Sequence, residues 1–117
     1  MTLSQIVERL VLRRLTPELR DREGTEVDSA HACDLLSDVL AHAPRGGLTL
    51  TIQAHLNVVA VAAHAEQSGV IFTSGMAPEE PVRARAVAEG LPLYATRDST
   101  FDTAGRLYAL GLRGRHE

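Results

Sequence analysis

The spacing of apolar and polar side chains singles out residues 48–74, which hold a strand, a helix and a second strand with almost nothing between them. In residues 48–53 apolar and polar side chains alternate, the two-residue period of a half-buried strand. Over residues 55–68 the apolar positions follow helical spacing, and they form so broad an apolar face that few faces of the helix could contact water. Gly69 is expected to end this helix in the left-handed conformation, and residues 70–73 are typical of a buried strand. The pattern predicts a right-handed βαβ unit.

Ahead of this unit, the pattern predicts a short helix, an edge strand and an exposed loop. Residues 3–10 place their apolar side chains on one helical face, and Thr2 with Gln5 forms a capping box at the start. Residues 11–15 combine a valine and two leucines with two arginines, which favours a strand at the edge of a sheet. Residues 18–25 are charged and contain a glycine, so we expect them to form an exposed loop.

Two further elements are expected before the central unit. Residues 27–33 suit either a short strand or an extended lead into the next helix, and the sequence leaves both interpretations open. Residues 34–43 have helical spacing, with Asp34 near the positive end of the helix dipole. The apolar residues of this helix that we expect to face inward are Leu35, Leu36, Val39 and Leu40.

After the central unit, the pattern predicts a helix, a strand and a last helix. Residues 79–89 are expected to form a helix that Gly90 closes, and residues 91–96 are typical of a third core strand. Ser99 resembles the capping residue of the last helix. The residues of that helix that share its expected inner face are Phe101, Ala104, Gly105 and Tyr108. Residues 113–117 are predicted to be a frayed tail.

The alternation of strands and helices predicts an α/β fold, a three-layer domain with a mainly parallel sheet and helices on both faces. At 117 residues the chain has room for one domain with one core, so residues 1–117 are interpreted as a single domain. No apolar run approaches the ~20 residues needed to span a bilayer, and the N-terminus lacks the pattern of a secretory signal. These features predict a cytoplasmic protein with no membrane partner.

Composition argues against several kinds of chemistry. The single cysteine rules out an internal disulfide, and no Cys/His cluster has the spacing of a zinc site. All twelve basic residues are arginine, so reactions that need a lysine Schiff base or a P-loop lysine are excluded. The net charge of −3 and the scarcity of aromatic side chains argue against a nucleic-acid partner. We predict no metal ion and no cofactor.

The predicted sheet places three loops at the carboxyl ends of its core strands. Ligands of open parallel sheets bind in the crevice outside those ends, which here means residues 53–57, 73–77 and 96–100. Each loop enters a helix N-terminus, where free backbone N–H groups and the helix dipole favour an anion. The residues predicted to contact a small anionic ligand are His55, Asn57, Thr73, Ser74, Gly75, Thr96, Arg97, Ser99 and Thr100.

Each loop also has a purely structural interpretation. His55 and Asn57 could cap a helix and bond to the neighbouring loop. Residues 73–75 suit an ordinary turn from strand to helix, and residues 96–100 contain the usual capping residues. The sequence leaves the ligand and the structural interpretations open at these loops.

Two polar groups elsewhere are interpreted structurally. Asp34 and Asp38 share a helix face with no histidine nearby in the sequence, so we expect a solvated helix N-terminus and no metal or acid–base site. His31 and Cys33 lie two residues apart and would share a face on an extended strand, as a nucleophile and its base can do. No third orienting group is evident, so Cys33 is interpreted as a small buried apolar residue.

Five segments spread between residues 34 and 111 have the sequence pattern of a known family. They are residues 34–39 (DLLSDV), 51–62 (TIQAHLNVVAVA), 69–75 (GVIFTSG), 99–104 (STFDTA) and 106–111 (RLYALG). On these segments the chain resembles the DRTGG domain family, which is similar to the N-terminal domain of HPr kinase/phosphorylase and recurs in some phosphotransacetylases and CBS-domain pyrophosphatases. Where many members have paired glycines, this chain has Ser74 and Gly75. The resemblance implies a regulatory or accessory module that is not an enzyme and associates as a dimer.

Together these observations predict a homodimeric, non-catalytic regulatory module. It would bind a small anionic ligand, such as a nucleotide or a phosphorylated metabolite, or a partner protein. No paired carboxylates, catalytic triad or metal-ligand set emerges from the sequence. Two alternatives stay open: an enzyme that uses His55 as its acid/base residue, and a purely structural subunit whose apolar surface contacts another protein.

Overall fold

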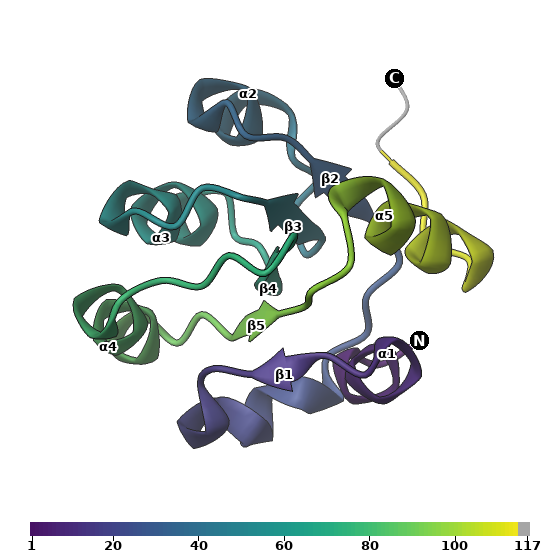
Figure 1. Ribbon diagram of the computed structural model, residues 1–117, viewed down its shortest axis with the longest axis horizontal. Helices are drawn as coiled ribbons and strands as arrows, with labels where there is room; N and C mark the ends of the chain where they lie inside the picture. Colours follow the sequence, from purple (N-terminus) through teal and green to yellow (C-terminus); the bar gives the residue numbers. More distant parts are fainter. Residues whose placement is uncertain (115–117) are drawn as a thin grey trace.

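A five-stranded sheet lies between two layers of helices in the computed structural model, which describes residues 1–114 (Figure 1). The strands are β1 Arg13–Arg14, β2 Ala30–Ala32, β3 Leu48–Thr51, β4 Gly69–Phe72 and β5 Leu93–Ala95. The helices are α1 Leu3–Leu10, α2 Leu36–His42, α3 Leu56–His64, α4 Glu80–Glu89 and α5 Thr100–Ala109, together with the 3-10 helix η1 Pro17–Gly24. None of these helices within residues 1–114 combines the length and the apolar character that crossing a membrane requires.

The connections between strands explain the two layers. The sheet has the order β1-β5-β4-β3-β2, in which β2 to β5 are parallel and β1 pairs antiparallel with β5. The helices that link the parallel strands, α2, α3 and α4, cover one face, whereas α1 and α5 cover the other (Figure 1). The predicted α/β fold, with three layers and a mainly parallel sheet, is confirmed.

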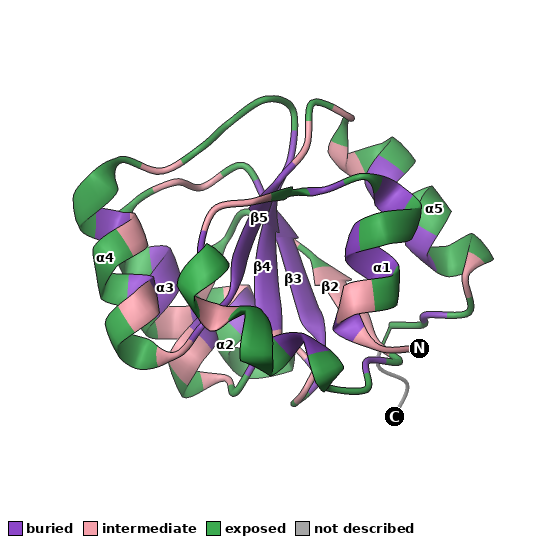
Figure 2. Cartoon of the chain, turned by 90° about the horizontal axis from the view of Figure 1, so that it is seen from below, coloured by how far each residue is buried: buried purple, intermediate pink, exposed green. Residues whose placement is uncertain are grey.

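The sheet separates two hydrophobic cores (Figure 2). Side chains alternate along β4, so Ile71 packs with residues of α1 and α5 while Val70 and Phe72 pack with residues of α3 and α4. All three side chains are fully buried. The short chain therefore builds two cores, where the sequence predicted one, because both faces of its sheet are covered.

β3 is buried on both faces and is not the half-buried strand that its alternation predicts. Its leucines lie in the core beneath α1 and α5, and its threonines lie buried on the opposite side. The Thr49 hydroxyl donates to Gln67 Oε1 and the Thr51 hydroxyl donates to Asp34 Oδ1, both at 2.9 Å. These hydrogen bonds let two polar residues occupy buried positions.

α3 is shorter and more exposed than the sequence predicts. It ends at His64, and Glu66 takes the left-handed conformation, with a φ of 55°, that was expected of Gly69. Gly69 begins β4, where a Cβ atom would lie 3.1 Å from the carbonyl oxygen of Pro92. Ala60 is exposed, as are the residues around the start of the helix. One side of α3 therefore contacts water, and the prediction that few of its faces could do so is wrong.

The predicted exposed loop over residues 18–25 is mostly the 3-10 helix η1, and one of its side chains is buried. Glu23 is only 5% exposed. Its carboxylate accepts hydrogen bonds from Arg14 at 2.9 and 3.0 Å and from the Tyr94 hydroxyl at 2.8 Å. A buried carboxylate is tolerated here because both a charged and a neutral donor pair with it.

The predicted inner faces of two helices are confirmed only in part: Val39 is buried as expected, and Leu36 of α2 and Ala104 of α5 pack against the cores. In α2 the buried residue is Val39, and in α5 the buried residues are Thr103 and Leu107. Thr103 can be buried because its hydroxyl donates to the carbonyl oxygen of Ser99 at 2.8 Å. The residues that were expected to face inward and are exposed are Leu35, Leu40, Phe101, Gly105 and Tyr108.

Helix ends and edges agree better with the sequence. The capping box of Thr2, the left-handed Gly90 at the end of α4 and the Ser99 cap of α5 are confirmed. β1 is an edge strand as predicted, and β2 lies within residues 27–33, which confirms their strand interpretation. The predicted tail is not frayed at Arg113, whose N–H donates to the Asp28 carbonyl at 3.1 Å. Residues 115–117 of that tail lie outside the described residues.

Candidate functional site

The carboxyl ends of the parallel strands border two cavities, because the connections from these strands go in different directions. β3 and β4 lead into α3 and α4 on one face, whereas β5 leads into α5 on the opposite face (Figure 1). Loops that diverge in this way after neighbouring strands leave the crevice in which open α/β sheets bind ligands. A cavity of about 500 Å³ lies beside the loops that follow β4 and β5.

Three arginines line this cavity, which we call the arginine cavity. Arg13 comes from β1, Arg97 from the loop after β5, and Arg106 from α5. Asp98 also lines it and pairs with Arg106 at 3.0 Å. Within residues 1–114, neither Arg13 nor Arg97 takes part in a recorded ion pair. The lining therefore carries an excess of positive charge, and guanidinium groups bind phosphate and carboxylate through paired hydrogen bonds.

Backbone hydrogen bonds hold the two loops of the cavity together. The N–H of Ser74 donates to the Asp98 carbonyl at 2.8 Å, and the N–H of Gly75 donates to the Thr96 carbonyl at 3.0 Å. Ser74 and Gly75 both have left-handed φ angles, of 59° and 75°. These N–H groups were expected to be free for an anion, but the loops use them to bind each other. Charge at the cavity comes instead from the arginine side chains.

Several of the polar side chains predicted to bind a ligand have structural partners. The hydroxyls of Thr73 and Thr100 lie 2.6 Å apart, which ties the start of α5 to the end of β4. Ser99 caps α5 by accepting from the N–H of Asp102 at 3.1 Å. The Thr96 hydroxyl accepts from the N–H of Asp98 at 3.2 Å. The structural interpretation of these residues therefore has direct support, while Gly75, Thr96 and Arg97 line the arginine cavity.

Val11 at the rim of the arginine cavity has a strained backbone. It ends α1 with a φ of 53°, which is rare for a β-branched residue, and its side chain is 83% exposed. The turn at Val11 leads directly into β1 and so sets the position of Arg13. Strained residues of this kind cluster at binding sites, where the surrounding structure holds them in place.

His55 lies at a second cavity of about 650 Å³, between the loops that precede α3 and α4. Ile52, Leu56 and Met76 give this cavity an apolar lining, and Glu79 is its carboxylate. Asn57 is exposed on α3 and lines neither cavity. The second cavity is larger, but for an anion the arginine cavity is the better site because guanidinium groups line it. The three predicted loops thus do not meet in one crevice.

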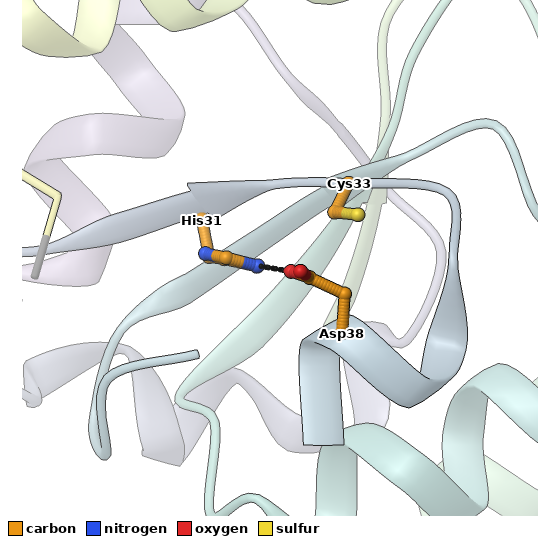
Figure 3. A group of neighbouring side chains, drawn as sticks. All are labelled: His31, Cys33 and Asp38. Atoms are coloured by element: carbon orange, nitrogen blue, oxygen red, sulfur yellow. Dashed lines mark hydrogen bonds and ion pairs between the residues drawn. The ribbon is translucent and has the colours of Figure 1, made fainter. Parts of the chain in front are cut away.

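A third group of polar side chains lies at the carboxyl end of β2 (Figure 3). His31 Nε2 is 2.7 Å from Asp38 Oδ1, and this hydrogen bond lowers the pKa of the Asp38 carboxyl. Cys33 is half-buried beside them and accepts from the N–H of Leu35 at 3.4 Å. The interpretation of Cys33 as a buried apolar residue is therefore wrong, and so is the expectation that Asp38 lacks a histidine neighbour.

Asp34 also differs from its predicted role. It is exposed, as predicted, but it does not lie at the start of a helix, because α2 begins two residues later at Leu36. Its carboxylate accepts from the Thr51 hydroxyl and from the N–H of Ile52, both at 2.9 Å. Asp34 thus fastens the loop after β2 to the end of β3.

The residues that sequence reasoning missed come from elements outside the three loops. Arg13 lies opposite Ala95 in the β1–β5 pairing, so the edge strand brings its charge to the end of β5. The two arginines of the predicted edge strand were a usable signal. The two-residue spacing placed His31 and Cys33 on one face, but no signal in the sequence placed Asp38 of α2 beside them.

Comparison with known proteins shows a related fold. No protein-family model and no curated protein matches the sequence. Among solved structures, the chain is similar to the crystal structure of the CBS and DRTGG domains of the regulatory region of Clostridium perfringens pyrophosphatase, complexed with its activator diadenosine tetraphosphate. The TM-score is 0.74 at 13% sequence identity, over 91% of this chain and 45% of that chain. The chain thus spans less than half of that structure, and at this identity the likeness extends to the fold alone.

Proposed function

We propose that the chain is a non-catalytic regulatory module that binds a small phosphorylated ligand, such as a nucleotide, in the arginine cavity. The observation that carries the proposal is the convergence of Arg13, Arg97 and Arg106 on one cavity with a single carboxylate, Asp98. A volume of about 500 Å³ is in the range of small-molecule sites. The position of the cavity, where the loops after β4 and β5 diverge, is where open α/β sheets bind ligands.

The related pyrophosphatase region supports the same ligand class. Its structure was determined in complex with diadenosine tetraphosphate, an activator that carries several phosphates. An arginine-lined cavity suits a polyphosphate because each guanidinium can donate two parallel hydrogen bonds to phosphate oxygens. If the proposal is right, this chain and the DRTGG-containing pyrophosphatase region share both a fold and a regulatory role that depends on a phosphorylated ligand.

An enzyme that uses His55 has less support. The His55 side chain is exposed, and within residues 1–114 no recorded hydrogen bond orients its ring. A general acid or base has to be held within hydrogen-bond reach of the reacting proton. The apolar lining of the second cavity supplies no such arrangement.

The ligand prediction is tested by calorimetry with diadenosine tetraphosphate, ATP and inorganic phosphate. A ligand at 100 times its dissociation constant should stabilise the fold by about 2.7 kcal/mol, and its affinity should fall with added salt. Arg97→Ala and Arg13→Ala should each weaken binding by roughly tenfold, because hydrogen bonds to charged groups contribute about 1.5 kcal/mol or more.

Arg85→Ala is the matched control, since Arg85 is an exposed arginine on α4 that lines neither cavity. The proposed site would be contradicted if neither Arg97→Ala nor Arg13→Ala changes the affinity for any of the three probes. The ligand would lie in the second cavity if the double substitution of His55→Ala and Asn57→Ala weakens binding and Arg97→Ala leaves the affinity unchanged.

We further propose that the module is a homodimer that uses the apolar second cavity. Ile52, Leu56 and Met76 are 41–46% exposed and line that cavity together.

Light scattering at micromolar concentration should give about twice the chain mass of 12.6 kDa. Leu56→Glu should yield a monomer, because it places a charge in the contact. Phe101→Glu, at an exposed apolar residue of α5, should leave the dimer intact. A protein that stays monomeric at all concentrations measured would contradict the proposed homodimer.

A further inference from the structure

We propose that His31, Cys33 and Asp38 form a binding site for one divalent transition-metal ion of the zinc class. Each side chain offers one ligand atom, and the imidazole nitrogen, the sulfur and the carboxylate oxygen all lie within 4.8 Å of one another. Figure 3 shows the His31 ring and the Asp38 carboxylate pointing toward each other, with Cys33 beside them. Within residues 1–114 no other group of three such side chains is close enough together to hold a metal ion.

The fold holds these three residues in place before any ion binds. His31 lies opposite Thr49 in the β2–β3 pairing, and the N–H of Cys33 donates to the Leu50 carbonyl at 3.1 Å. Because alternate residues of a strand point to the same side, His31 and Cys33 face the same layer. α2 then folds back beneath the strand and presents Asp38 to both.

Packing also fixes the position of Asp38. The next residue, Val39, is fully buried and anchors α2 on the body of the protein. The loop between β2 and α2 is fastened by Asp34, whose carboxylate accepts from the N–H of Ile52 at 2.9 Å. Supports of this kind around a metal site reduce the reorganisation that binding requires.

The spacing needs only small side-chain movements to accommodate an ion. In a tetrahedral zinc site with bonds of about 2.0 Å to nitrogen and oxygen and about 2.3 Å to sulfur, ligand atoms lie roughly 3.3–3.6 Å apart. The 2.7 Å contact between His31 and Asp38 would open slightly, and the Cys33 sulfur already lies within 4.8 Å of both other ligand atoms. The His31 and Asp38 side chains are 20% and 37% exposed, which leaves them room to move and leaves the ion a path from solvent.

The ligand types select the class of metal. Nitrogen, sulfur and oxygen from His, Cys and Asp match zinc and similar transition metals, whereas magnesium and calcium prefer oxygen alone. Three protein ligands leave one tetrahedral position for water or an anion. The site is separate from the arginine cavity, since β2 and β1 are at opposite edges of the sheet.

The same residues do not have the arrangement of an activated thiol. A base that activates Cys33 would bond to its sulfur, but His31 Nε2 bonds to Asp38. The sulfur of Cys33 is instead close to the backbone of Leu35, which donates its N–H at 3.4 Å. Metal binding, which needs convergence of the three atoms and no particular proton path, fits the geometry better.

The test is a titration of the full chain, free of any affinity tag, with Zn²⁺ by calorimetry and with Co²⁺ by absorption spectroscopy. One ion should bind per chain, and the Co²⁺ complex should show the charge-transfer absorption of a thiolate ligand. His31→Ala, Cys33→Ser and Asp38→Asn should each weaken Zn²⁺ binding by at least about tenfold, the lower end of the loss seen when even indirect partners of a ligand are removed.

His64→Ala and Asp21→Asn are the matched controls, because both residues are exposed and lie outside the group. Bound Zn²⁺ should also slow the alkylation of Cys33. The proposal is overturned if neither ion binds, if the charge-transfer absorption is absent, or if Cys33→Ser binds Zn²⁺ as tightly as the native chain. Circular dichroism of each variant shows whether it is folded, and Cys33→Ser, the smallest change, decides the outcome if another variant unfolds.

Discussion

A Val59→Asp protein is expected not to fold. Val59 is fully buried in α3, in the core that α3 and α4 form with β4 and β5. Among the buried residues of the described part of the chain none is basic, so none can pair with a carboxylate at this position. An unpaired buried charge costs several kcal/mol, which is comparable to the whole stability of a small domain. The expected results are loss of the cooperative urea transition and of native circular dichroism.

Ala60→Asp is the control for this substitution. Ala60 is the next residue of α3 and lies on its exposed side, so the same carboxylate there reaches water. The change should alter the free energy of unfolding by less than about 1 kcal/mol. A Val59→Asp protein that unfolds cooperatively, with the stability of Ala60→Asp, would show that α3 is not packed against the sheet.

Glu23→Ala is expected to lower the free energy of unfolding by about 3 kcal/mol. It removes the acceptor for three hydrogen bonds from Arg14 and one from the Tyr94 hydroxyl, and both donors are left without a partner. The Arg14 side chain is 24% exposed, so water recovers part of the loss. The melting temperature should fall by roughly 10 °C or more. Glu18→Ala in the same 3-10 helix removes an exposed ion pair with Arg83 and should leave the free energy of unfolding nearly unchanged.

The pH dependence of stability gives an independent check on Glu23. Burial raises the pKa of its carboxyl, but the hydrogen bonds from Arg14 and Tyr94 outweigh burial, so the pKa in the folded protein is lowered. A group whose pKa is lowered stabilises the fold above its unfolded pKa of about 4.3, and that contribution is lost as the pH falls through the folded value. Native protein should therefore lose stability in this acid range more steeply than Glu23→Gln. Equal slopes would contradict the buried ion pair.

Features set by neighbouring residues were predictable from the sequence. The capping box at Thr2, the left-handed Gly90 and the Ser99 cap each depend on chemistry within a few residues, and the structure has all three. The alternation of strands and helices was enough to predict a three-layer α/β fold. These signals are local, so no knowledge of the partner elements was needed.

Features set by distant contacts were not predictable. Glu23 is buried because Tyr94, far along the chain, supplies a hydroxyl to it. α5 turns Leu107 inward in place of Phe101 because its packing on β2, β3 and α1 decides which face is covered. Periodicity gives the width of an apolar face, but the contacts decide its orientation.

The candidate sites divide in the same way. The sequence located the carboxyl ends of the strands, and Arg97 lies at one of them. It could not show that α5 leaves the sheet on the opposite side from α4, which is why His55 and Arg97 line different cavities. Arg13 reaches its cavity, and Asp38 reaches His31, only through the pairing and packing of other elements.

The pairing of β1 with β5 has a consequence for the order in which the chain can assemble. β2, β3, β4 and β5 each pair with the strand made just before or after them, so these contacts close short loops as synthesis proceeds. Arg14 pairs with Tyr94, and α1 packs in a core that contains Tyr94 and Leu107. α1 therefore has to wait, with part of its apolar face uncovered, until β5 and α5 have been made.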